Sequence, residues 1–98
     1  MPTYEATPRF TTDLRRLSPA QRRRFHQAVN AFVRDLCTGR GSFRAGLRVK
    51  GVRCAPGVFE LTWDSNGRAT WQYGPEIVPG EQHIVWRRIG THSILNRP

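Results

Sequence analysis

The sequence predicts one α+β domain, in which a mostly antiparallel sheet of four to five strands carries two N-terminal helices on one face. An amphipathic helical pattern lies in the first half of the chain, and alternating apolar and polar residues recur in the second half. The length of 98 residues allows one hydrophobic core but not two. We therefore treat residues 1–98 as a single domain.

The clearest predicted element is a helix that begins after Ser18. The segment Ser18-Pro19-Ala20-Gln21 is a capping box with proline at the first helical position, and Gly39 is expected to end the helix. Between them the apolar residues recur with a helical period: Phe25, Ala28, Val29, Phe32, Val33 and Leu36. Before this helix we predict a strand over residues 4–9. A short helix with Leu14 and Leu17 should follow it, capped at Thr11-Thr12.

Alternation predicts four further strands, at residues 47–53, 58–63, 68–73 and 83–94. A three-residue loop, Ser65-Asn66-Gly67 with Gly67 left-handed, would pair Leu61 with Trp71 and Thr62 with Thr70. It keeps the aromatic residues of both strands on one face, whereas a two-residue turn would mix aromatic with polar residues. We expect the tryptophans of this face to lie in the core rather than to stack on bases: Trp63, Trp71 and Trp86.

The charge balance is strongly basic. Fifteen arginines and one lysine face seven acidic residues, for a net charge of +9. This excess predicts a polyanionic or acidic partner. No apolar stretch reaches membrane length, and the first residues lack a signal-peptide pattern. The two cysteines match no zinc or redox spacing. We therefore expect a cytoplasmic protein with reduced, packed thiols and no membrane contact.

The other face of the predicted sheet collects polar and charged residues: Arg48, Lys50, Glu60, Thr62, Arg68, Thr70 and Gln72. The chain has no phosphate-binding glycine loop, zinc-ligand set or nucleophile elbow. Its carboxylates are too few for metal-assisted phosphoryl transfer, so we expect no metal and no cofactor. RNA cleavage by the ribose 2′-hydroxyl needs only a base, an acid and cations. These residue types occur in His92, Lys50, Glu60, Arg68 and Arg48.

Two arginines and a histidine lie in the last predicted strand. Alternation places Arg87 and Arg88 on opposite faces, so that at most one lines the polar face and the other forms an ion pair or lays its stem along the surface. His92 follows Gly90 at the strand end, a position that is also typical of an exposed or capping histidine.

The order of these segments resembles the RelE/ParE toxin superfamily, and within it the RelE-like ribosome-dependent mRNA interferases. The resemblance spans nearly the whole chain and rests on the capped helical hairpin, Phe59-Glu60-Leu61-Thr62-Trp63, Gly67-Arg68-Ala69-Thr70-Trp71 and the Gly90-x-His92 ending. It implies a β-α-α-β-β-β-β fold, an acidic antitoxin partner, and metal-independent cleavage of mRNA on the ribosome. It also implies the toxin role in a type II toxin–antitoxin system, with a free toxin that is monomeric.

The resemblance also implies roles for individual residues. Arg68 and Arg48 would bind the scissile phosphate, while His92, Lys50 or Glu60 would supply the acid and the base, in roles that stay unassigned. Nucleic-acid contacts would come from Arg53 and from Arg87 or Arg88. RelE-type toxins commonly end in a tyrosine that stacks on a base, whereas this tail, Ile94-Leu95-Asn96-Arg97-Pro98, has no aromatic residue. Two alternatives stay open: a ParE-like gyrase inhibitor, and a non-catalytic nucleic-acid-binding module.

Overall fold

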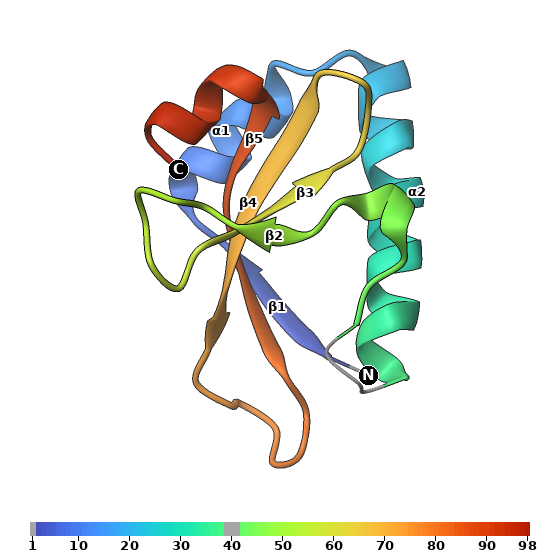
Figure 1. The fold of residues 1–98 in the computed structure, drawn as a ribbon, viewed down its shortest axis with the longest axis vertical. Coiled ribbons are helices and arrows are strands. Elements are labelled where there is room, and N and C mark those ends of the chain that lie inside the picture. The colour runs from blue at the N-terminus through green and yellow to red at the C-terminus, as the bar shows by residue number, and fades with distance from the viewer. Residues whose placement is uncertain (1, 39–41) are drawn as a thin grey trace.

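The computed structural model describes residues 2–38 and 42–98, which form two helices and a five-stranded sheet (Figure 1). The elements in chain order are β1 (Thr3–Ala6), α1 (Pro8–Arg15), α2 (Pro19–Cys37), the 3-10 helix η1 (Ala45–Leu47), β2 (Lys50–Gly51), β3 (Phe59–Thr62), β4 (Gly67–Gly74), β5 (His83–Thr91) and the 3-10 helix η2 (His92–Asn96). The strand order is β1-β5-β4-β3-β2, with β1 parallel to β5 and the other pairs antiparallel. The predicted α+β fold is confirmed, with one parallel pair in the sheet.

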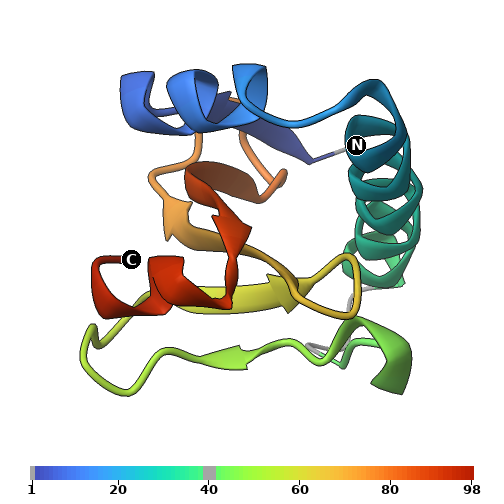
Figure 2. The same ribbon diagram turned by 90° about the horizontal axis from the view of Figure 1, so that it is seen from above.

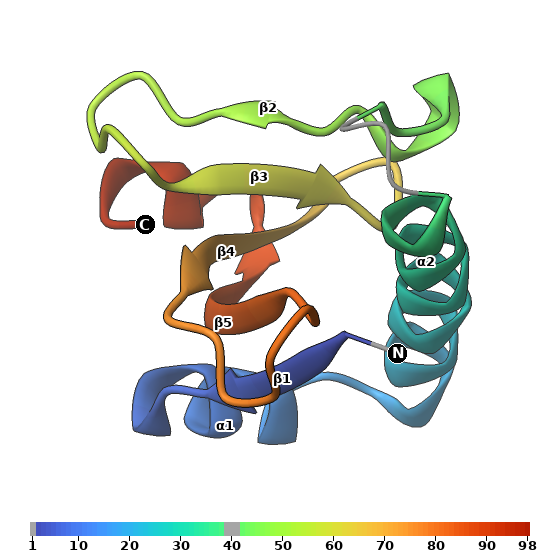
Figure 3. The ribbon, with the colours of Figure 1, turned by 90° about the horizontal axis from the view of Figure 1, so that it is seen from below.

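Helix α2 has the predicted N-terminus. The Ser18 hydroxyl accepts from the Gln21 amide at 3.1 Å, and the Gln21 side chain accepts from the Ser18 amide at 2.8 Å. Its C-cap is Thr38, and the predicted stop at Gly39 lies outside the described residues. Seen along the sheet, α2 lies against one side of the strands and α1 lies beside β1 and β5 (Figures 2 and 3).

The start of α1 differs from the prediction. Strand β1 ends at Ala6, and Thr7 rather than Thr11 is the N-cap, because its hydroxyl accepts from the Phe10 amide at 3.1 Å. Pro8 explains the early start, since proline cannot donate to a strand ladder but suits the first turn of a helix. Leu14 lies in α1 as predicted, whereas Leu17 lies between the helices.

The core lies between α2 and the aromatic side of the sheet. Trp63, Trp71 and Trp86 are at most 8% exposed, as predicted, and they pack with Phe25 and Phe32 of α2. Phe10 of α1 joins the same cluster. The tryptophans therefore stabilise the fold and are not exposed platforms for bases.

The loop between β3 and β4 has the predicted length but another position. The Trp63 backbone amide donates to the Gly67 carbonyl at 3.2 Å, so the three loop residues are Asp64-Ser65-Asn66. Leu61 pairs with Ala69 instead of Trp71, and Thr62 pairs with Arg68 instead of Thr70. Gly67 is not left-handed. A side chain on Gly67 would come within 2.6 Å of the Trp63 indole, so close packing requires this glycine. The shift of two residues preserves the faces.

The side of the sheet opposite α2 is only partly polar, and we call it the open side. The 3-10 helix η2 lies on it, opposite α2 (Figure 2). Its Ile94 packs so closely on Gly90 that a Cβ there would lie 3.0 Å from the isoleucine side chain. Ile94, Val52 and Val58 are buried, and the Thr70 hydroxyl is buried without a hydrogen-bond partner among the described residues. The open side is therefore partly covered by apolar side chains and by η2.

Two smaller predictions concern cysteines and membranes. Cys37 and Cys54 are free thiols, but both are exposed, so the expectation of packed thiols is wrong. Within residues 2–38 and 42–98, neither helix has the length and apolar character needed to cross a bilayer.

Candidate functional site

The first hollow, which we call the lysine hollow, contains four of the predicted site residues. It has a volume of about 370 Å³ and is lined by Ala45, Arg48, Val49, Lys50, Glu60, Thr62 and Arg68. Strand register brings them together, because Lys50 pairs with Glu60 and Thr62 with Arg68. Directly opposite side chains of an antiparallel pair lie close enough to interact.

Lys50 and Glu60 contribute opposite charges in different surroundings. The Lys50 ammonium lies 3.9 Å from a Glu60 carboxylate oxygen, a long contact for an ion pair. The lysine side chain is 70% exposed, whereas the glutamate side chain is only 8% exposed. The hollow thus combines a carboxylate set into the sheet with a solvated ammonium at its mouth.

Arg68 is oriented by its own loop. Its Nη1 donates to the carbonyls of Gly67 at 2.9 Å and Asp64 at 3.3 Å. Within the described part of the chain, Nε and Nη2 have no hydrogen-bond partner. The loop therefore fixes the guanidinium and leaves two of its nitrogen groups free to donate to an anion.

Arg48 has a strained backbone. With φ 48° and ψ 43°, it is the one non-glycine residue in the left-handed region among residues 2–38 and 42–98. This conformation costs roughly 1–2 kcal/mol for an L-residue. It ends η1 and explains why β2 begins at Lys50 rather than at the predicted residue 47. Strain at an exposed arginine beside a charged hollow is a reason to suspect function.

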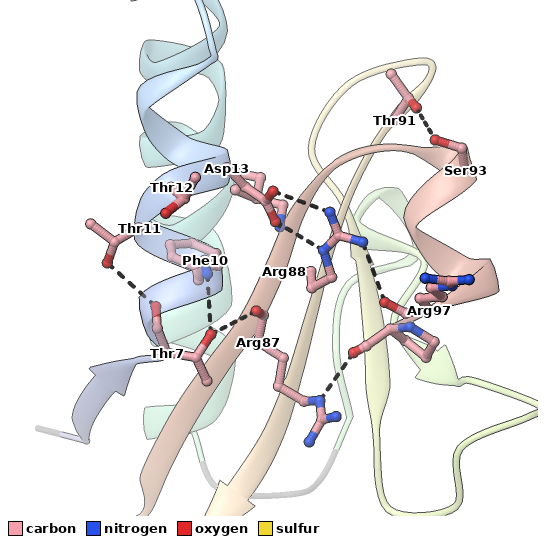
Figure 4. A network of polar contacts seen from close by, with 12 residues as sticks. Thr7, Phe10, Thr11, Thr12, Asp13, Arg87, Arg88, Thr91, Ser93 and Arg97 are labelled. Atoms are coloured by element: carbon pink, nitrogen blue, oxygen red, sulfur yellow. Dashed lines mark hydrogen bonds and ion pairs between the residues drawn. The ribbon is translucent and has the colours of Figure 1, made fainter.

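The second hollow, which we call the arginine hollow, lies between the start of α1 and the tail (Figure 4). It has a volume of about 450 Å³ and is lined by Thr7, Arg9, Ala55, Arg87, Arg88, Arg97 and Pro98. Because both Arg87 and Arg88 line it, the prediction of opposite faces is wrong. The reason is a β-bulge: Thr70 pairs with Arg88 and Trp71 with Trp86, so Arg87 is an extra residue.

Hydrogen bonds to the protein engage most of the guanidinium nitrogens of these two arginines. Arg88 donates from Nε and Nη2 to the Asp13 carboxylate at 3.0 and 3.1 Å, and from Nη1 to the Arg97 carbonyl at 3.4 Å (Figure 4). Arg87 donates from Nε to the Pro98 carbonyl at 3.1 Å and from Nη1 to the Gln72 side chain. The expected ion pair is therefore made by Arg88, while Arg87 keeps Nη2 free of any described partner.

Asp13 is a residue that the sequence interpretation missed. It is only 6% exposed, and besides Arg88 it accepts from the Ile89 amide at 3.3 Å. Its carboxylate thus binds the edge of β5 beyond the point where β1 ends. In the sequence, Asp13 lies three positions after the apolar Phe10 and thus on the same face of the short helix. This position indicates burial, and a buried acid needs a cationic partner.

His92 and Arg53 line neither hollow. His92 is exposed at the start of η2, and its amide donates to the Asn66 carbonyl at 3.1 Å. Because Thr91 pairs with Gly67 and Gly90 with Arg68, His92 lies at the same end of the sheet as Arg68. Arg53 is exposed in the segment between β2 and β3. Among the described residues, no group of three His, Cys, Asp or Glu side chains could hold a metal ion.

The chain has the fold of the RelE/ParE superfamily toxins, as predicted. It resembles YafQ from E. coli strain BL21(DE3), with 13% identity, a TM-score of 0.61, and coverage of 97% of this chain and 98% of that one. For the YoeB/ParE toxin from Agrobacterium tumefaciens these values are 11%, 0.64, 92% and 98%. For the RelB–RelE antitoxin–toxin complex from Methanococcus jannaschii they are 16%, 0.58, 93% and 93%. No family model and no curated protein matches the sequence.

At these identities the likeness shows the fold and leaves the chemistry to be argued from the site. Two of these neighbours, YafQ and the Methanococcus jannaschii RelE, have also been solved in toxin–antitoxin complexes. The chain is thus a small basic domain with the fold of these toxins and a charged hollow beside β2, β3 and β4.

Proposed function

We propose that this chain is the toxin of a type II toxin–antitoxin system, an endoribonuclease that cleaves ribosome-bound mRNA without a metal ion. The observation that carries the proposal is the lysine hollow. It gathers a carboxylate, an ammonium and two arginines, in a chain with the fold of RelE/ParE toxins.

The reaction assigns a task to each kind of group. The ribose 2′-oxygen attacks the adjacent phosphorus, a base removes its proton, and an acid protonates the departing 5′-oxygen. The products are a 2′,3′-cyclic phosphate and a 5′-hydroxyl end. Negative charge grows on the phosphate oxygens, where the free donors of Arg48 and Arg68 would stabilise it. Glu60, Lys50 and His92 are the acid and base candidates, with their individual roles open.

The partners follow from charge. The net charge of +9 suits the phosphates of mRNA and the ribosome. Further candidates for contacts with these phosphates are Arg53, Arg87 and Arg88. It also suits an acidic antitoxin, which would bind and neutralise the toxin. We expect the free toxin to be a cytoplasmic monomer. Arg87 is a better candidate for a phosphate contact than Arg88, because Arg88 is already paired with Asp13.

The test is induced expression of the wild-type chain and of Arg68→Ala, with mRNA 5′ ends mapped in translating extracts. The proposal expects codon-phased cuts and growth arrest for the wild type, and neither for the variant. Stabilised gyrase–DNA breaks without mRNA cuts would favour the gyrase-inhibitor alternative. Salt-dependent binding without toxicity would favour a non-catalytic binding module. If Arg68→Ala still cleaves at the wild-type rate, the site assignment is wrong.

A further inference from the structure

A third hollow adjoins the lysine hollow, and we call it the side hollow. Its volume is about 470 Å³, and Arg48 and Thr62 line both hollows. Its other walls come from α2, from the turn that contains η1, and from the loop between β3 and β4. In Figure 1 this green turn and this yellow loop both lie beside α2. Arg48 thus lies on the ridge that separates the side hollow from the candidate cleavage site.

The walls of the side hollow are tied together. Arg24 of α2 donates to the Asp64 carboxylate of the β3–β4 loop at 3.1 Å. The Asp64 carbonyl accepts from the Gly67 amide at 3.0 Å and from Arg68. The same loop therefore orients Arg68 for the lysine hollow and forms one wall of the side hollow. The side hollow is open to solvent, and these contacts join two of its walls before any ligand binds.

The chemistry of the side hollow differs from that of a phosphate site. Its one arginine besides Arg48 is Arg24, whose charge is paired with Asp64, and this carboxylate would repel a phosphate. What remains are neutral and acidic hydrogen-bonding groups: the Gln27 amide, the Ser65 hydroxyl and the second oxygen of Asp64. Within the described residues, the side chains of Gln27 and Ser65 have no hydrogen-bond partner. Gln27 and Ser65 can each donate and accept, and the Asp64 oxygen accepts, so together these groups match the donors and acceptors on the edge of a nucleobase.

We propose that the side hollow binds the nucleobase next to the scissile phosphate, and that Gln27, Asp64 and Ser65 determine which base is preferred. The inference rests on the proposed function and adds a specificity subsite to it. A phosphate held by Arg48 in the lysine hollow would direct one of its two neighbouring nucleosides across the ridge. The left-handed backbone of Arg48 fixes the position of that ridge.

The experiment compares cut-site preferences of Gln27→Ala, Ser65→Ala and Asp64→Asn with those of the wild type. The 5′ ends of cleaved mRNA are mapped in translating extracts, and the base at each position around the cut is tabulated. We expect Gln27→Ala and Asp64→Asn to change the preference at one position beside the cut by about tenfold. Asn30→Ala is the matched control, because Asn30 is an exposed polar residue of α2 that does not line the hollow.

Two further controls separate the possible causes. Arg24→Ala removes the ion pair without changing the carboxylate, so it shows whether loss of that pair alone alters the preference. Thermal melting confirms that each variant is folded. The inference is overturned if the base preference of Gln27→Ala and Asp64→Asn equals that of the wild type at every position, whether or not the overall rate falls. A wild-type chain that makes no phased cuts would instead overturn the proposed function.

Discussion

The lysine hollow and the arginine hollow lie on the same open side of the sheet and both contain arginines, but the arginines of the two hollows differ in how far they are paired. In the arginine hollow, Arg88 is bound by a buried carboxylate and Arg87 by an amide oxygen and a carbonyl. In the lysine hollow, Lys50 makes one contact of 3.9 Å, and the Arg48 guanidinium has no partner among the described residues. The arginine hollow stabilises the fold, and the lysine hollow keeps its cations available.

This difference shows that net charge alone does not locate a site. Removing a buried cation destabilises the fold, because its partner is then buried without a counter-charge. An exposed cation beside a strained backbone contributes little to stability. Substitutions in the arginine hollow should therefore mainly lower stability, and substitutions in the lysine hollow should mainly lower cleavage.

The largest effect on stability is expected for Arg88→Ala. This change leaves the Asp13 carboxylate buried without its cation, so the free energy of unfolding should fall by about 3–5 kcal/mol. Urea unfolding followed by tryptophan fluorescence measures it. Arg87→Ala is the control, with a smaller expected loss, because it leaves no buried carboxylate without its cation. Equal losses for the two variants would show that Asp13 does not distinguish them.

Arg48→Gly should raise stability while it lowers cleavage. Glycine adopts the left-handed conformation freely, so we expect a gain of about 0.5–1 kcal/mol in the free energy of unfolding. Loss of the guanidinium should reduce cleavage by at least about tenfold. Arg48→Ala is the control, since it loses the guanidinium but keeps the backbone strain. A destabilised Arg48→Gly would contradict the view that the backbone is strained for the sake of the site.

The smallest effect concerns an exposed ion pair outside both hollows. Hydrogen bonds from the Arg44 side chain, and then from its backbone, hold the pKa of Asp35 below its ordinary value. A lowered folded-state pKa stabilises the fold above the unfolded-state pKa of about 3.9, and this contribution is lost as the pH falls through the folded-state value.

Asp35→Asn should therefore lower the melting temperature slightly at neutral pH. The difference from the wild type should shrink as the pH falls below about 4. Glu76→Gln serves as the control for removing an exposed carboxylate. A difference that is the same at neutral and acid pH would show that the charge of Asp35 is not its cause.

The sequence predicts the parts of this fold whose signals are local. The Ser18 capping box marks the start of α2, and strict alternation around Leu61 and Trp71 places the core side of β3 and β4. Even parity also puts Lys50, Glu60 and Arg68 on one side of the sheet. These features need only the helical and strand periods.

The features that the sequence did not reveal depend on tertiary contacts. The bulge at Arg87 interrupts alternation without a glycine, and it coincides with the segment that Thr7 and Asp13 of the α1 region bind. Arg48 adopts a conformation that favours glycine, so its residue type gives no warning. The open side is partly buried because Ile94 packs on Gly90. This contact depends on where the C-terminal segment lies in the fold, which the sequence pattern does not indicate.

The central claim is that the lysine hollow carries the chemistry, and one paired measurement tests it most directly. Cleavage rates in a translating extract and free energies of unfolding are determined for Arg68→Ala and Arg87→Ala. We expect Arg68→Ala to lose about 10²–10³ in rate and to change stability by less than about 1 kcal/mol, and Arg87→Ala to lose less than about tenfold in rate. Wild-type cleavage by a folded Arg68→Ala variant, or an equal loss for both variants, would contradict it.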